Sequence, residues 1–163
     1  MNSILIRIAT LTMALAFIST AAFAAGSAPS TSKKPGVDSY NEGVKLMQDG
    51  QFARAQAEFE AALDRNPNMA EAHNNLGYSL RKQGTANYQK ALEHYNRAIE
   101  LDVNLAEAYM YRGVLHMLMG NEEKALQDHR TLTGLDRGLA DALQAAIASG
   151  EEPDGLEGLA TSW

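Results

Sequence analysis

Residues 70–84 read AEAHNNLGYSLRKQG and residues 106–120 read AEAYMYRGVLHMLMG, so one frame recurs after 36 residues. Both stretches begin with Ala-Glu-Ala, carry a glycine at the eighth position and end in glycine, while most other residues change. Small and large apolar residues recur at intervals of three and four, which is the period of an amphipathic helix. A closing glycine suits a helix C-terminus, because it adopts left-handed backbone angles without steric cost. The sequence therefore predicts two equivalent helices.

Two further sets of small residues extend this frame along the chain. They are Gly43, Gly77 and Gly113, spaced by 34 and 36 residues, and Ala55, Ala91 and Ala125, spaced by 36 and 34. The order of the gaps reverses because the middle unit has two extra residues between Gly84 and Ala91. An insertion confined to a turn leaves both flanking helices in register. A period of about 34 residues, with two helices in each unit, is typical of a helical repeat array.

At these residues the chain resembles the tetratricopeptide repeat (TPR) family, over residues 36–139. The two sets match the small positions of the family, and Phe59 and Tyr95 match its aromatic position. His129 stands at that aromatic position in the third unit, which is the weakest match, as a terminal repeat often is. The resemblance implies an all-α fold: a TPR-type α-solenoid of three antiparallel helix hairpins and a C-terminal capping helix.

We expect four parts in the chain. They are a signal peptide (1–24), a flexible linker (25–36), the TPR domain (37–149) and an acidic tail (150–163). Within the domain the repeats run over about 36–69, 70–105 and 106–139, and the capping helix over 138–149. Asn-x-x-Glu or Ser-x-x-Glu patterns at 39–42, 68–71 and 104–107 predict capping boxes at three helix starts. The tail is expected to be frayed, with docking of Trp163 onto the domain as the alternative.

The first 25 residues have the pattern of a secretory signal. Arg7 precedes an apolar run that ends in the small-residue motif Ala22-Phe23-Ala24. The run is shorter than the roughly 20 residues that a membrane helix needs, so cleavage after Ala24 is favoured over retention as an anchor. The chain has no cysteine, which excludes disulfides, thiolate metal sites and lipid attachment through cysteine. We therefore expect a soluble, exported protein of a bacterial periplasm.

Charge and motifs exclude several function classes. The net charge is −6, and removal of Arg7 with the signal makes it −7, which opposes binding to nucleic acid or to an anionic membrane. We find no phosphate-binding glycine loop and no nucleophile elbow, so we expect no enzyme activity and no cofactor. Of the four histidines, His116 and His129 are expected to face each other in the third hairpin, but no metal-ligand spacing is present.

The resemblance implies that the first helix of each hairpin lines a concave groove for a peptide or protein segment. The groove residues are then Tyr40, Val44, Met47, Asn74, Asn75, Tyr78, Arg81, Met110, Tyr111, Val114 and Met117. We expect apolar contact from Met and Tyr, and hydrogen bonds from Asn to a ligand backbone. Alternatively, some of these side chains pack against the capping helix, the tail or a neighbouring subunit.

The charged end of this groove has two interpretations. Arg81 and Lys82 pair with an acidic residue of a ligand, or they are solvated cations at a helix C-terminus. TPR domains that clamp the C-terminal carboxylate of a chaperone use five groove positions, which correspond here to Tyr40, Val44, Asn75, Glu107 and Tyr111. Only Asn75 matches that pattern, so we do not expect clamping of this kind.

The sequence thus favours a non-catalytic interaction module or scaffold of the bacterial cell envelope, which is monomeric and binds a protein partner. The first alternative is a self-associating structural protein. The second is a protein that binds a metal through its histidines.

The signal prediction can be checked by mass. When the chain is produced in a bacterium with its leader intact, the exported product should begin at Ala25, as measured by intact-mass spectrometry. A product that retains residues 1–24 in the membrane fraction would instead identify the segment as an anchor.

Overall fold

The computed structural model describes residues 34–160 and 162–163, so the predicted signal peptide and most of the predicted linker lie outside the described residues. The described part contains helices and no strand. The helices are α1 (Val37–Gln48), α2 (Phe52–Arg65), α3 (Ala70–Lys82), α4 (Tyr88–Leu101), α5 (Ala106–Leu118), α6 (Glu122–Leu135) and α7 (Arg137–Ser149), with short 3₁₀ turns η1 (Thr85–Asn87) and η2 (Leu156–Leu159). None of these helices is both long and apolar enough to cross a bilayer.

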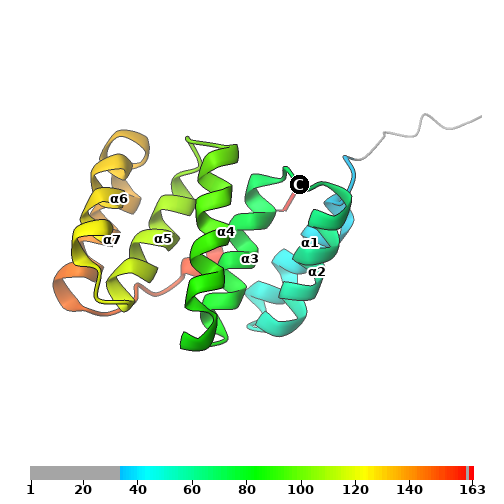
Figure 1. Ribbon diagram of the computed structural model, residues 1–163, viewed down its shortest axis with the longest axis horizontal. Helices are drawn as coiled ribbons and strands as arrows, with labels where there is room; N and C mark the ends of the chain where they lie inside the picture. Colours follow the sequence, from blue (N-terminus) through cyan, green and yellow to red (C-terminus); the bar gives the residue numbers. More distant parts are fainter. Residues whose placement is uncertain (1–33, 161) are drawn as a thin grey trace, which may run out of the picture. The chain divides into compact units, whose positions relative to one another are not determined.

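Consecutive helices form three antiparallel hairpins, α1–α2, α3–α4 and α5–α6, which stack side by side (Figure 1). Helix α7 packs against both α5 and α6 and covers the last hairpin. The predicted all-α TPR solenoid with a capping helix is therefore confirmed. The two-residue insertion of the middle unit is absorbed in η1, in the turn before α4, so both helices of that hairpin keep their register.

Glycines end the first helix of each hairpin as predicted. Gly50, Gly84 and Gly120 have φ angles of 73°, 116° and 74°. After α5, the amide of Asn121 donates to the carbonyl of His116 at 2.8 Å, which closes the helix end in a Schellman arrangement.

The predicted capping boxes are wrong. The residues that precede α1, α3 and α5 are Gly36, Met69 and Leu105, and none of them makes a side-chain capping bond. Before α5, the amide of Asn104 donates to Asp102 Oδ1 at 2.9 Å, so Asn104 lies inside a turn and the helix begins after it. The described helix that does have a side-chain cap is α7, where the amide of Leu139 donates to Asp136 Oδ1 at 3.0 Å.

The recurring glycines of the first two hairpins accommodate aromatic rings from the second helix of the same hairpin. A β-carbon at Gly77 would lie 2.8 Å from the ring of Tyr95, and one at Gly43 would lie 2.7 Å from that of Phe59. In the third unit, where His129 replaces the aromatic residue, the close neighbour of Gly113 is Leu143 of α7. The capping helix therefore supplies the packing that the third hairpin lacks.

This packing predicts opposite effects for two glycine-to-alanine substitutions. Gly77→Ala should lower the free energy of unfolding by about 1–2 kcal/mol, because overpacking against the buried Tyr95 ring outweighs the gain in helix propensity. Gly134→Ala in α6 has open space around its β-carbon and should raise that free energy by about 0.5–1 kcal/mol. Urea unfolding of both variants measures this, and equal effects would contradict the close packing.

Candidate functional site

The wall formed by α1, α3 and α5 is covered by the protein's own C-terminus. After Ser149 the chain reverses at Gly150, which has φ 74°, and residues 151–163, here called the C-terminal segment, run back past α5 and α3 to end beside α1 (Figure 1). The expectation of a frayed tail is therefore wrong. Of the predicted groove residues, Met117 is partly buried, and the buried ones are Tyr40, Val44, Met47, Asn74, Asn75, Tyr78, Arg81, Met110, Tyr111 and Val114.

The first contact of the segment is an ion pair at the end of α3. The side chain of Arg81 is only 1% exposed, and its Nη1 lies 2.8 Å from Glu152 Oε2. Lys82 Nζ lies 3.2 Å from the other carboxylate oxygen. The guanidinium carbon of Arg81 also lies 4.9 Å from the ring centroid of Tyr78. Arg81 is thus a buried, paired cation, and the interpretation of a solvated helix end is wrong for it.

The pair shifts the protonation equilibrium of Glu152. Burial acts to raise the pKa of this carboxyl, but the hydrogen bond and charge of Arg81, together with Lys82, outweigh burial and hold the pKa below its usual value. The Glu152 carboxylate is therefore ionised at neutral pH when it lies beside Arg81 and Lys82.

Further along, the groove holds the backbone of the segment. Tyr111 Oη donates to the carbonyl of Leu156, and Gln48 Nε2 donates to that of Ala160 at 3.3 Å. Asn41 makes two bonds of 2.8 Å to Trp163, donating through Nδ2 to the carbonyl and accepting at Oδ1 from the amide. Because these contacts are made to the main chain, they hold the segment without reading its side chains.

Besides Glu152, two side chains of the segment, Leu156 and Trp163, contact the groove or the chain beside it. Leu156 is buried, and its carbonyl is the one that Tyr111 holds. The ring of Trp163 lies 5.9 Å from that of Tyr40, with Lys34 Nζ 4.4 Å from its centroid on the chain leading into α1. Trp163 remains 46% exposed, so its ring is only partly enclosed by these contacts.

The asparagines of α3 bond to each other and to Tyr40, and their predicted hydrogen bonds to a ligand backbone stay a prediction. Asn75 Nδ2 donates to Tyr40 Oη at 3.2 Å, and Asn74 Nδ2 donates to Asn75 Oδ1 at 3.3 Å. The amides that bind the segment are Asn41 and Gln48 of α1. Sequence analysis left Asn41 out, although seven residues separate it from Gln48, which puts both on one helix face. That spacing is the signal that could have found it.

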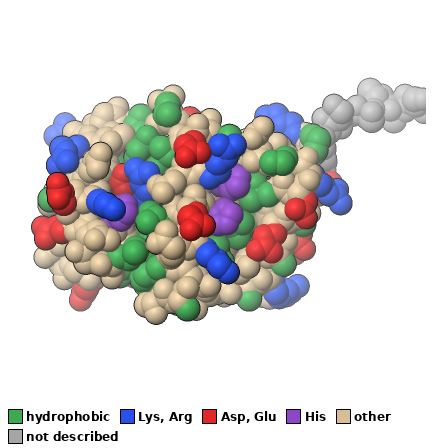
Figure 2. Space-filling model, in the orientation of Figure 1, with side chains coloured by type: hydrophobic (Ala, Val, Ile, Leu, Met, Phe, Trp, Pro, Cys, Tyr) green, Lys and Arg blue, Asp and Glu red, His purple; other side chains and the backbone are tan. Residues whose placement is uncertain are grey.

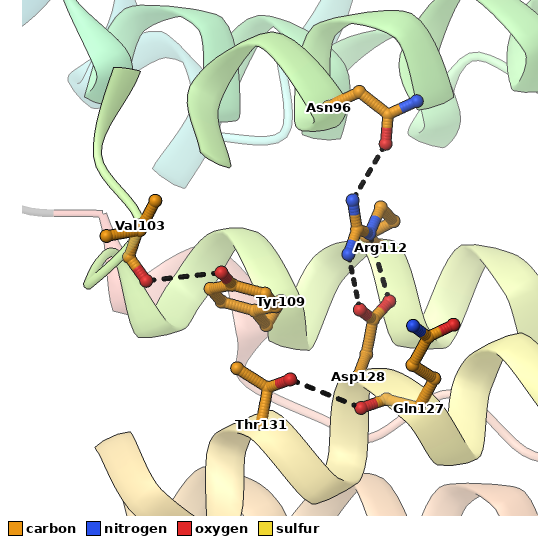
Figure 3. A network of polar contacts seen from close by, with 7 residues as sticks. All are labelled: Asn96, Val103, Tyr109, Arg112, Gln127, Asp128 and Thr131. Carbon is orange, nitrogen blue, oxygen red and sulfur yellow. Dashed lines mark hydrogen bonds and ion pairs between the residues drawn. The ribbon is translucent and has the colours of Figure 1, made fainter. Parts of the chain in front are cut away.

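The opposite side of the repeats carries a separate polar network. Arg112 of α5 forms two bonds to Asp128 of α6, of 3.1 and 2.6 Å, and one of 2.8 Å to Asn96 of α4 (Figure 3). His116, which is buried, and Lys124 line a cavity of about 280 Å³ beside this network. The network ties the third hairpin to the second. On the face seen in Figure 2, acidic and basic side chains alternate without a large patch of one sign.

The histidines pair differently from expectation. His73 and His94 stack with ring centroids 5.3 Å apart, and their Nδ1 atoms are 3.1 Å apart. The expected His116–His129 ring contact is absent from the described residues. The described part of the chain also contains no group of three or more side chains placed to hold a metal ion.

Comparison with known proteins agrees with this architecture. A family model described as Tetratricopeptide repeat matches residues 40–102, and one described as TPR repeat matches residues 87–120. The chain belongs to the tetratricopeptide repeat family. Human Tetratricopeptide repeat protein 6 is 36% identical over 88 residues, covering 54% of this chain and 16% of the relative. Human Cell division cycle protein 16 homolog is 32% identical over 104 residues, covering 58% and 16%. The TPR chain thus spans about a sixth of these relatives.

Solved structures share the fold at low identity. The first TPR of Spaghetti, bound to an HSP90 peptide, superposes with a TM-score of 0.64 at 18% identity and covers 71% of this chain and 91% of its own. PcrH, in complex with the chaperone binding region of PopD, gives a TM-score of 0.62 at 20% identity and covers 69% and 88%.

Acid should release the C-terminal segment. Because the folded-state pKa of Glu152 lies below its unfolded value, the stabilisation by the ion pair is complete above about pH 4.5 and is lost as pH falls through the lower folded pKa. The emission of Trp163, the one tryptophan in the sequence, should then shift to the red. Glu152→Gln is the control, because it removes the carboxyl that titrates, so its Trp163 emission should not change over this pH range. The same acid-induced red shift in that variant would contradict the assignment of the transition to Glu152.

Proposed function

We propose that the protein is a non-catalytic interaction module whose groove on α1, α3 and α5 holds an acidic segment of a partner protein. The observation that carries this proposal is the seating of a chain segment across all three helices. Arg81 pairs with its carboxylate, while Tyr111, Gln48 and Asn41 hold its backbone. A partly solvated cleft with such contacts suits peptide recognition, in which main-chain bonds provide affinity and a few pockets provide specificity.

The relatives support the same mode. The first TPR of Spaghetti and PcrH were both solved with peptide or protein segments bound, as their descriptions state. The groove residues proposed for this chain are those predicted from the sequence, with Asn41 and Gln48 added. We infer that the protein is exported to a bacterial periplasm, on the strength of its signal-like N-terminal sequence.

Self-association is the second candidate, and one observation favours it. A groove that accepts the segment of its own chain has the right chemistry for the same segment of another copy. The monomer is favoured because only Gly150 and Glu151 separate α7 from the residue that Arg81 binds, so the local concentration of the attached segment is high.

Photocrosslinking tests the groove. A benzophenone amino acid in place of Gln48 should give adducts with an envelope protein, and an excess of synthetic peptide with the sequence of residues 151–163 should suppress them. The matched control carries the same group in place of Arg130, which is exposed on α6. Adducts that form equally at both sites, or that the peptide leaves unchanged, would reject the groove as the binding site.

A further inference from the structure

The C-terminal segment lies in the groove as a ligand would, although its Leu156 and Ala160 join the hydrophobic core. It follows the end of α7 and crosses the groove with only the short turn η2 as regular structure. The contacts described for it are the ion pairs of Glu152 with Arg81 and Lys82, several bonds to its backbone, the contacts of the Trp163 ring and the burial of Leu156 and Ala160. The three hairpins and α7 pack through separate contacts. We therefore expect the helices to stay folded when the segment leaves the groove, with loss of the core contacts of Leu156 and Ala160.

Charge fixes the orientation of whatever lies in the groove. Arg81 and Lys82 attract a carboxylate at the α3 end, where Glu152 lies. At the other end Glu71 and Glu107 line the wall beside Leu159 and Ala160. An acidic side chain is therefore stabilised beside Arg81 and Lys82 and repelled beside Glu71 and Glu107. An apolar side chain is accepted beside the two glutamates. The groove selects a carboxylate followed by apolar residues, in that order.

The fit of the segment is incomplete. A cavity of about 50 Å³ remains between the segment and the wall, lined by Asn74 and Ala160 among others. Asn74 Oδ1 is buried there without a hydrogen-bond partner. A buried acceptor without a partner is unfavourable. A ligand that fills the cavity and donates a hydrogen bond to this oxygen therefore binds more tightly than the C-terminal segment does.

We propose that residues 151–163 are a built-in ligand that closes the groove, and that the partner is a segment of the same chemistry which displaces it. That chemistry is a carboxylate for Arg81 and Lys82 and, four residues later, a leucine for the position of Leu156. The proposal rests on the proposed function, because it requires that the groove accept a segment from outside.

Attachment to the chain explains why displacement is demanding. A tethered segment has an effective concentration on the order of millimolar, so a segment with an intrinsic dissociation constant of about 10 μM keeps the groove closed about 99% of the time. The apparent affinity of a competitor then falls about 100-fold, since only the open fraction binds it. Only ligands that are presented at high local concentration, or that fit better, enter the groove.

The test uses the full chain and a fluorescein-labelled peptide with the sequence of residues 151–163. Glu152→Lys should open the groove, because it places a cation beside Arg81 and Lys82. We expect a red shift of Trp163 emission and binding of the peptide at least tenfold tighter than by the unaltered chain, measured by anisotropy. Glu151→Lys is the matched control: it makes the same charge change at an exposed neighbour and should change neither value.

Leu156→Asp provides a second opening that leaves Arg81 and its surroundings unaltered, and circular dichroism checks that each variant retains its helices. A labelled peptide that carries lysine at the position of Glu152 should lose binding to the opened variants. If the unaltered peptide binds equally well to the Glu152→Lys and Leu156→Asp variants and to the unaltered chain, the proposal that the segment closes the groove is overturned, but the proposed function of the groove is not. Release of Trp163 with no peptide binding in any variant would instead overturn the proposed function. A concentration-dependent dimer of the unaltered chain in sedimentation would overturn closure within one chain.

Discussion

The groove depends on one buried charge, the guanidinium of Arg81. A cation removed from water is tolerated when an anion and hydrogen bonds replace its hydration, and loss of one partner of a buried pair costs about 3–5 kcal/mol. Arg81 is 1% exposed and its carboxylate partner is Glu152, which lies outside the repeats. The need to neutralise this charge brings the C-terminal segment to α3, and its remaining contacts follow from that attachment.

The capping helix gives the segment its starting point. In the third hairpin, Leu143 of α7 fills the space beside Gly113 that an aromatic ring fills in the first two hairpins. This contact docks α7 against α5, and the left-handed Gly150 then turns the chain toward the groove. A weakness of the last repeat, its missing aromatic residue, is thus linked to the placement of the segment that covers the groove. The packing of α7 against the third hairpin therefore sets the point from which the C-terminal segment enters the groove.

The repeat frame could be predicted from sequence because it is periodic. Gly43, Gly77 and the helix-ending glycines recur in register with their partners, so the fold follows from spacing alone. The start of α5 could not be placed by the same reasoning, because the Asn104 amide bonds to Asp102 and a local turn replaces the capping box.

The repeat also places the predicted groove residues at fixed positions, and packing of some of them against the tail was an open alternative, but the individual contacts of the tail could not be predicted. Arg81 pairs with a residue 71 positions later, and Asn41 pairs with Trp163, 122 positions later. Contacts of such separation leave no periodic trace in a single sequence. The tail sequence is acidic and rich in glycine, which is typical of a solvated end, whereas its observed placement depends on contacts with Arg81, Tyr111 and Asn41, which are distant in sequence.

Electrostatics explains how an acidic protein recognises an acidic segment. With a net charge of −6, the chain repels an anionic ligand at long range, so its field does not accelerate encounter. Selection therefore occurs after contact, when the carboxylate loses water and meets Arg81 in a region of low dielectric constant, where the pair is much stronger than at the surface. The attached segment avoids the encounter step altogether, which favours it over any free competitor of equal fit. Under the proposed function, a partner overcomes that advantage through complementarity within the groove, at the cavity beside Asn74 that the segment leaves unfilled.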